Sequence, residues 1–299
     1  MSKKLSKLIV VLGPTASGKT NLAIKLAKKF NGEIISADSR QVYRGMDIGT
    51  GKITKKEMEG IPHYLLDVAS PKRKFTIAQY RKLTLQAINK ITKKRKIPIL
   101  CGGTAFYVRA TINGISIPEM KPDWELRKKL EKKSVGELYK MLKKMDPRRA
   151  KTIEKENPRR LIRAIEIILK TKKPVSPLRE KPLPCPILII GIKKSPAELK
   201  KLIRKRLLKR LKKGMVAEVK KLRKSGISWK RLEEFGLEYR FIAQYLQRKL
   251  KYNEMVEKIQ RESEHFAKHQ MTWFKKDERI RWIRTYPQAE KLTRKFIKN

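Results

Sequence analysis

Residues 13–20 of this chain, Gly-Pro-Thr-Ala-Ser-Gly-Lys-Thr, match the phosphate-loop pattern G-x-x-x-x-G-K-[ST]. A run rich in β-branched residues precedes the loop at residues 8–12, and apolar residues with helical spacing follow it at residues 22–30. This context favours a real site over a chance match, because loop N–H groups and a helix N-terminus together surround phosphate oxygens. Lys19 would neutralise an outer phosphate, and the Thr20 hydroxyl would ligate Mg²⁺. The residues expected to bind phosphate are Gly13, Pro14, Thr15, Ala16, Ser17, Gly18, Lys19 and Thr20.

Further apolar runs predict strands at residues 33–38, 97–101 and 186–192, and residues 279–283 alternate charged with apolar side chains as a short edge strand does. Residues 76–94 have helical periodicity. Strands separated by helices indicate a parallel sheet covered on both faces. The predicted fold is therefore α/β, with a P-loop NTPase-like parallel sheet flanked by helices.

The pattern changes between the third and fourth predicted strands. Residues 118–184 show only helical periodicity, with prolines at both edges. We predict an inserted all-helical domain there, within a catalytic core made of residues 1–117 and 185–299. At least three Lys/Arg-rich helices are expected after the fourth strand, at residues 197–213, 235–250 and 254–274.

Charge is the most unusual feature of the composition. Among 299 residues, 77 Lys and Arg outnumber 28 Asp and Glu, which gives a net charge of +49 at pH 7. Such a charge destabilises a compact chain unless a polyanion or salt screens it, so nucleic acid or anionic lipid is the expected class of partner. A Lys-rich proteome or a hot habitat is the alternative explanation.

Cysteine usage and hydropathy bear on the compartment. Cys101 and Cys185 lie far apart, which excludes a disulfide framework and the paired spacing of a zinc site. No apolar run approaches the roughly twenty residues of a membrane span, and residues 8–12 are too few for a secretion signal. We therefore expect a cytoplasmic protein that does not bind membranes.

Asp38 follows the second predicted strand, at the edge of an open α/β sheet where ligands bind. It is a candidate general base for an acceptor near the bound phosphates, but it could instead cap residues 39–41 or be a second metal ligand. NTP hydrolysis usually needs a carboxylate on a neighbouring strand end. Residues 102–104 (GGT) supply none and Asp67 is the remaining candidate, which weakens the NTPase interpretation.

Several further motifs occur together and in order. Besides residues 13–20 they are residues 36–43 (SADSRQVY), 47–52 (DIGTGK), 62–68 (PHYLLDV), 102–104 (GGT), 159–166 (RRLIRAIE) and 272–274 (TWF). With them, most of the chain resembles the family of tRNA dimethylallyltransferases, also called tRNA isopentenyltransferases or IPP transferases. Many eukaryotic relatives append a zinc finger, for which two cysteines do not suffice, so the resemblance is to the bacterial type.

The resemblance implies transfer of a dimethylallyl group from dimethylallyl diphosphate to N6 of the tRNA adenosine 3′-adjacent to the anticodon, which is position 37. The products would be N6-isopentenyladenosine and diphosphate, and the phosphate loop would hold the prenyl diphosphate instead of ATP. Asp38 would take the proton from the attacking amine. Lys19, Mg²⁺ on Thr20, and Arg206 would stabilise charge on the departing diphosphate. Arg206 is assigned only by its match to a family helix arginine eight residues before Gly214, because spacing alone gives it no role.

The resemblance also implies contacts with the tRNA anticodon stem-loop. The adenosine is expected to flip into the pocket, because a stacked base cannot reach a buried carboxylate. We expect a monomer, and we expect Thr104 to act at the target nucleotide. A solvated basic helix face is the alternative role for the three arginines at 159–163. The residues expected to contact tRNA are Asp38, Ser39, Arg40, Gln41, Thr104, Arg159, Arg160, Leu161, Ile162 and Arg163.

Two segments depart from the family pattern. Residues 105–107 (AFY) replace the usual Gly-Leu-Tyr, which predicts a tighter pocket wall. Residues 236–240 (GLEYR) stand where the family usually has a Gly-Tyr pair, so the resemblance does not settle whether this loop keeps the family's tRNA contacts.

The aromatic and histidine residues near the end of the third basic helix have helical spacing. His265 and His269 lie four apart without a third ligand, which favours an exposed face or RNA contact over a metal site. Phe266, Trp273 and Phe274 are expected to be core residues rather than a stacking platform.

Two other functions share some of these features. A small-molecule kinase also has a phosphate loop and an Asp after the second strand, and it would turn over ATP without RNA. A non-catalytic RNA-binding protein whose loop senses nucleotide would bind tRNA in a salt-sensitive way without changing it.

Overall fold

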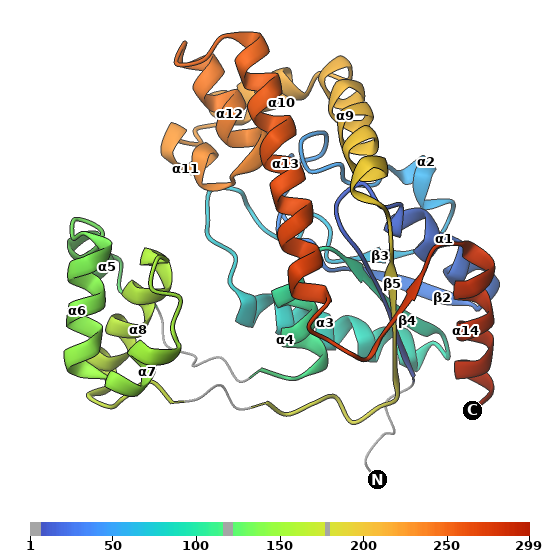
Figure 1. The fold of residues 1–299 in the computed structure, drawn as a ribbon. Helices are drawn as coiled ribbons and strands as arrows, with labels where there is room; N and C mark the ends of the chain where they lie inside the picture. The colour runs from blue at the N-terminus through green and yellow to red at the C-terminus, as the bar shows by residue number, and fades with distance from the viewer. Residues whose placement is uncertain (1–6, 116–121, 177–179) are drawn as a thin grey trace. The chain divides into compact units, whose positions relative to one another are not determined.

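A parallel β-sheet organises the larger part of the chain (Figure 1). The computed structural model describes residues 7–115, 122–176 and 180–299. Within them six strands lie in the order β3-β2-β4-β1-β5-β6, with every neighbouring pair parallel. The predicted parallel α/β fold is thereby confirmed. The strands are β1 (Leu8–Leu12), β2 (Gly32–Ser36), β3 (His63–Tyr64), β4 (Ile97–Gly102), β5 (Ile187–Ile192) and β6 (Ile280–Ile283).

The central strand β1 is buried on both faces. It pairs with β4 on one side and β5 on the other, and all five of its residues are buried. Its odd and even positions join different hydrophobic cores, because successive side chains of a strand point to opposite faces. This arrangement explains why the strand is apolar at every position.

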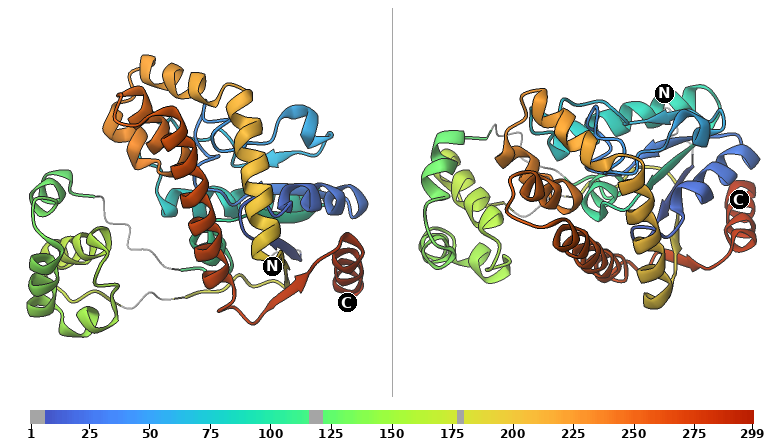
Figure 2. Two further views of the ribbon diagram at one scale, coloured as in Figure 1. Left: turned by 45° about the horizontal axis from the view of Figure 1, so that its top comes forward. Right: turned by 90° about the horizontal axis from the view of Figure 1, so that it is seen from above.

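Helices cover both faces of the sheet (Figures 1 and 2). α1 (Lys19–Lys29) and α14 (Tyr286–Lys298) pack in one core, and α3 (Ile77–Lys93) and α4 (Ala105–Ile112) pack in the other. α9 (Pro196–Lys212) begins just after the carboxyl end of β5 and packs beside α13 (Tyr252–Phe274), so both helices can reach the ligand-binding edge of the sheet. The other helices of this part are α2 (Lys55–Met58), α10 (Met215–Lys224), α11 (Trp229–Glu234) and α12 (Leu237–Leu246).

The predicted strands correspond to β1, β2, β4, β5 and β6, and β6 is the edge strand that was expected. The other edge strand, β3, was not predicted, because two residues are too few to show a periodic pattern. The helix expected at residues 235–250 is shorter in the structure: it begins after Gly236, whose φ of +75° is not helical. α14 was not predicted either.

The chain divides into two compact units, one within residues 1–114 and 182–299 and one within residues 115–181. The second unit contains helices and has a hydrophobic core of its own, which includes Leu138, Leu142 and Ile165. Residue 118, the expected start of the inserted domain, lies outside the described residues. The helices of this unit are α5 (Trp124–Leu130), α6 (Val135–Met145), α7 (Pro147–Thr152) and α8 (Pro158–Thr171).

None of the helices in the described part of the chain combines the length and the apolar character that a membrane span needs.

Candidate active site

The phosphate loop connects the carboxyl end of β1 to α1. Gly18 caps α1 with a left-handed φ of +89°, and Ala16 adopts a φ of +61° that is uncommon for a residue with a side chain. The buried hydroxyl of Ser17 has no hydrogen-bond partner among the described residues. An orphaned polar atom inside such a loop is what a bound oxyanion or water satisfies.

Two cations converge on this loop. Nζ of Lys19 donates to the carbonyl oxygen of Pro14 at 2.9 Å, and burial lowers the pKa of Lys19 to about 8, with the charge of Arg206 acting in the same direction. Arg206, on α9, donates through Nη2 to the Thr15 hydroxyl. Burial lowers the pKa of Arg206 to about 10, and the charge of Arg210 adds to the effect. No carboxylate among the described residues forms an ion pair with Lys19 or Arg206, so an anionic ligand is the natural counter-charge.

Asp38 follows β2 and holds the turn that comes after it. Its Oδ1 accepts hydrogen bonds from the N–H groups of Arg40 at 2.8 Å and Gln41 at 3.4 Å. The expected alternative of a loop cap is therefore realised, but by one oxygen only. Oδ2 makes no hydrogen bond with any described residue, which leaves it available to a substrate.

The ends of β2 and β4 are held together beside Asp38. Thr104 donates its N–H to Ala37 O at 3.1 Å, and its hydroxyl accepts from Ser39 N–H at 3.1 Å. A Cβ on Gly102 would lie 2.1 Å from the Ala37 oxygen, so only glycine permits this approach. Thr104 therefore sets the position of the segment that carries Asp38.

Nine of the predicted site residues line one pocket of about 360 Å³. Cys101 lies in its wall, and burial raises the pKa of that thiol to about 12, so the thiol is neutral and a weak nucleophile near neutral pH. The structure thus brings together predicted site residues that come from four separate parts of the sequence. The predicted residues that line the pocket are Thr15, Lys19, Thr20, Asp38, Ser39, Arg40, Gln41, Thr104 and Arg206.

The pocket also contains Gln270 of α13, to which the sequence analysis assigned no role. Its Oε1 accepts from Thr15 N–H at 2.8 Å, and its Nε2 donates to Gly103 O at 2.7 Å. The residue is buried on the inner face of the helix. The sequence signal that could have found it is helical spacing: Gln270 lies three residues after Ala267 and four before Phe274, which places a polar side chain on an apolar helix face.

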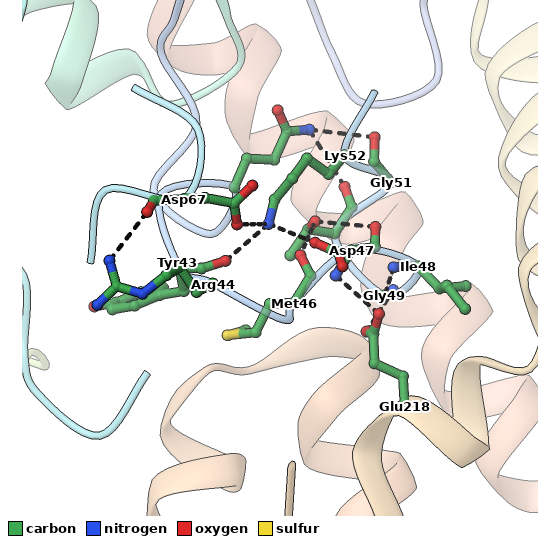
Figure 3. A network of polar contacts seen from close by, with 12 residues as sticks. Tyr43, Arg44, Met46, Asp47, Ile48, Gly49, Gly51, Lys52, Asp67 and Glu218 are labelled. Carbon is green, nitrogen blue, oxygen red and sulfur yellow. Dashed lines mark hydrogen bonds and ion pairs between the residues drawn. The ribbon is translucent and has the colours of Figure 1, made fainter. Parts of the chain in front are cut away.

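A rim loop at residues 47–52 is anchored from two sides (Figure 3). The carboxylate of Glu218, on α10, accepts the N–H groups of three consecutive residues, Asp47, Ile48 and Gly49, at 2.6 to 3.0 Å. From the other side, Nζ of Lys52 donates to Asp47 Oδ1 at 2.6 Å and to Asp67 Oδ1 at 2.5 Å. Asp67 is thus paired with Lys52 and does not line the pocket, so it does not supply the carboxylate that NTP hydrolysis needs.

The candidate tRNA residues of the helical unit lie on α8. Arg159 and Arg160 are exposed, and Arg163 donates to the buried carboxylate of Glu166 at 2.6 Å. Leu161 and Ile162 are buried in the core of the unit. Their side chains therefore cannot make the tRNA contacts expected from the sequence, because they point into the helical unit rather than to its surface.

The remaining candidates lie along the second half of α13. His265 and His269 are exposed, and the described residues contain no cluster of three His, Cys, Asp or Glu side chains fit for a metal ion. Phe274 is a core residue as predicted, but the prediction is wrong for Trp273 and Phe266, which are 43% and 40% exposed. Only the stripe containing Gln270 and Phe274 faces inward, and Phe266 instead lies at the pocket.

Comparison with known proteins gives consistent results. A family model described as IPP transferase matches residues 41–277. A tRNA dimethylallyltransferase of Acetivibrio thermocellus is 42% identical over 287 residues, which cover 93% of this chain and 92% of the relative. One from Carboxydothermus hydrogenoformans is 40% identical over 300 residues, covering 97% and 96% of the two chains.

Solved structures agree with the sequence matches. The crystal structure of a tRNA isopentenylpyrophosphate transferase from Staphylococcus epidermidis matches with a TM-score of 0.70 and 35% identity, over 98% of this chain and 99% of that one. A eukaryotic dimethylallyltransferase, captured in crystallographic snapshots of its action on tRNA, matches with a TM-score of 0.76 and 28% identity. That match covers 90% of this chain and 69% of the eukaryotic one.

Proposed function

This chain belongs to the IPP transferase family, and from that membership we propose that its pocket prenylates tRNA. The reaction transfers a dimethylallyl group from dimethylallyl diphosphate to N6 of the adenosine at position 37, and it releases diphosphate. The observation that carries the proposal is one pocket in which Lys19 and Arg206 face a phosphate loop while Asp38 keeps one carboxylate oxygen open.

The diphosphate end of the pocket is suited to a leaving group. As the bond between the prenyl carbon and the diphosphate oxygen breaks, negative charge grows on the diphosphate. Lys19 and Arg206 both contact the phosphate loop, at Pro14 O and at the Thr15 hydroxyl, so two cations lie beside the loop that would hold this charge and can stabilise it. The bound diphosphate in turn keeps Lys19 protonated, because a nearby negative charge favours the charged ammonium.

The acceptor end of the pocket supplies a base. As N6 of the adenine bonds to the prenyl carbon, the nitrogen becomes positively charged and must lose a proton. Asp38 accepts it through Oδ2, while Oδ1 keeps the turn at residues 39–41 in place. Thr104 holds the turn from the other strand end through Ser39.

Magnesium fits this donor set. The hydroxyl of Thr20 lines the pocket, and Mg²⁺ commonly combines one or two protein oxygens with substrate phosphates and water. Thr20 and the diphosphate oxygens would hold the ion, which would supply additional neutralisation of the leaving group.

The tRNA is proposed to meet the chain at two places. Ser39, Arg40 and Gln41 line the mouth of the pocket and can contact a flipped adenosine and its neighbours. Arg159 and Arg160, exposed in the helical insertion, are proposed to contact the anticodon stem-loop. We also propose that the protein acts as a monomer, and a tRNA substrate supports a cytoplasmic location.

The test is a two-substrate assay. Purified protein is incubated with Mg²⁺, dimethylallyl diphosphate and an unmodified tRNA that has consecutive adenosines in its anticodon loop, and the digested nucleosides are analysed by mass spectrometry. N6-isopentenyladenosine that requires both substrates is the expected product. ATP consumption without RNA in a parallel assay would favour a kinase instead, and tRNA binding without either product would favour an RNA-binding protein.

A further inference from the structure

The amide of Gln270 joins two parts of the active site that are far apart in sequence. Its Oε1 accepts from Thr15 N–H in the phosphate loop, and its Nε2 donates to Gly103 O at the end of β4. Its side chain is 5% exposed, and both ends of the amide are satisfied. A buried amide costs free energy unless it is hydrogen-bonded, so both bonds hold the side chain in one orientation.

On the loop side, Gln270 fixes the residue before a strained position. Thr15 is held at its N–H by Gln270 and at its hydroxyl by Arg206. The next residue, Ala16, has a left-handed φ of +61°, a conformation that is unfavourable for a residue with a Cβ. The anchor at Thr15 therefore helps to keep the loop in the conformation that presents its later N–H groups to a phosphate.

On the strand side, Gln270 fixes the residue before Thr104. A Cβ on Gly103 would lie 2.4 Å from Nε2, so glycine is what allows the amide to approach the backbone. Thr104 then holds Ser39, which is next to Asp38. The same amide is thus connected to the wall that carries the base.

We propose that Gln270 is a positioning residue that fixes the phosphate loop relative to the backbone segments that carry Thr104 and Asp38. The leaving group and the base are then held in the relative positions that one bound substrate needs. This proposal rests on the proposed function and goes beyond it, since Gln270 itself performs no chemical step. Small misplacements of reacting groups cost large factors in rate, so the effect should appear in both diphosphate affinity and turnover.

The first test replaces the amide with an apolar side chain of similar length. Gln270→Met leaves Thr15 N–H and Gly103 O buried without partners. We expect the Kd of inorganic diphosphate with Mg²⁺, measured by calorimetry, to rise about tenfold, and kcat for tRNA prenylation to fall at least about tenfold.

Gln260→Met is the matched control. Gln260 is a buried glutamine on the same helix, but it contacts Lys200 O and Glu264 rather than the phosphate loop. Its replacement should leave both constants within about twofold of the wild type, because Gln260 neither lines the pocket nor contacts the phosphate loop. The same Kd for diphosphate in both methionine variants would overturn the proposal, even if Gln270→Met melts at a lower temperature.

The second test replaces Gln270 with a side chain of nearly the same shape whose hydrogen bonding depends on pH. In Gln270→Glu a protonated carboxyl can donate to Gly103 O and accept from Thr15 N–H, whereas a carboxylate repels both the carbonyl oxygen and the diphosphate. The diphosphate affinity of this variant, divided by that of the wild type at each pH, should improve as the pH falls from about 8 to about 5.5. The division cancels the titration that the two proteins share, that of diphosphate itself included, and a ratio that does not change with pH would contradict the proposal.

Failure of this proposal is separable from failure of the proposed function. If the wild-type protein forms no N6-isopentenyladenosine, the proposed function is wrong. The binding comparison between Gln270→Met and Gln260→Met uses inorganic diphosphate alone, so it decides the loop-positioning role whether or not transfer occurs.

Discussion

At Asp38, one carboxylate oxygen holds the backbone and the other faces the pocket, so the two roles can be separated by substitution. Asp38→Asn keeps an oxygen that accepts from Arg40 N–H but cannot take a proton, whereas Asp38→Ala loses both functions. We expect Asp38→Asn to lower kcat by about 10²-fold to 10⁴-fold, with tRNA affinity and melting temperature close to wild type. Asp38→Ala should also loosen the turn and lower the melting temperature. Near-normal kcat in Asp38→Asn would assign Asp38 to the turn alone.

The protonation of Lys19 predicts how kcat/KM for dimethylallyl diphosphate depends on alkaline pH. Its pKa is lowered to about 8 by burial, so the free enzyme loses this charge as the pH rises above 8. The charged form binds diphosphate, so kcat/KM for dimethylallyl diphosphate should fall above about pH 8. At saturating substrate the bound diphosphate keeps Lys19 charged, and kcat should stay level to higher pH. Steady-state kinetics between about pH 7 and 9.5 test this, and Lys19→Met should lack the alkaline limb; a parallel fall of kcat and kcat/KM would contradict the assignment.

At the scale of an element, the rim loop at residues 47–52 is also held by a carboxylate that accepts backbone N–H groups. The loop has no regular structure, and three of its consecutive N–H groups depend on the carboxylate of Glu218 (Figure 3). Gln41 contacts the same loop by donating to Gly51 O at 3.3 Å. Glu218 therefore supports the mouth of the pocket from α10 without lining it.

Glu218→Gln should weaken that support. An amide offers only one acceptor oxygen and turns an NH₂ group toward backbone donors, so we expect a loss of about 1–3 kcal/mol of stability. KM for tRNA should rise more than KM for dimethylallyl diphosphate, because the loop is at the mouth rather than at the phosphates. Urea unfolding and separate KM measurements check this. Glu257→Gln, an exposed site on α13, is the control, and equal effects of the two substitutions would refute the role of the loop.

Local and distant elements of the site differed in how well the sequence predicted them. The phosphate loop and β1 could be predicted, because the loop motif and the apolar run of the strand each consist of consecutive residues. Gln270 lies 255 residues from Thr15, and Glu218 lies 170 residues from Ile48, so no local pattern relates them. Arg206, 191 residues from Thr15, was found only through resemblance to a family. Trp273 was misassigned because helical spacing alone does not say which face of a helix is covered.

At the scale of the whole molecule, the two units have separate hydrophobic cores. Ile165 is fully buried in the helical unit, so Ile165→Ala should destabilise that unit by about 2–5 kcal/mol. Hydrogen exchange should accelerate at residues 122–176 and stay unchanged in β1 and β4. The Kd of diphosphate should also stay at the wild-type value, because the pocket belongs to the other unit. Faster exchange throughout the chain would mean that the two units unfold as one.

With a net charge of +49, the chain can attract tRNA through its total charge, through contacts of particular side chains, or through both. Diffuse attraction depends on the total, whereas phosphate contacts depend on particular side chains, and each contact adds roughly 0.7 to 0.9 to the slope of log Kd against log salt. Replacing both Arg159 and Arg160 with Ala should therefore reduce that slope by about 1 to 2 and raise KM for tRNA. Replacing Lys291 and Lys298, two exposed lysines on α14, removes the same charge and should change the slope much less. Equal slopes for the two double variants would mean that the insertion attracts tRNA only through its total charge, and the proposed anticodon contact of α8 would have to be abandoned.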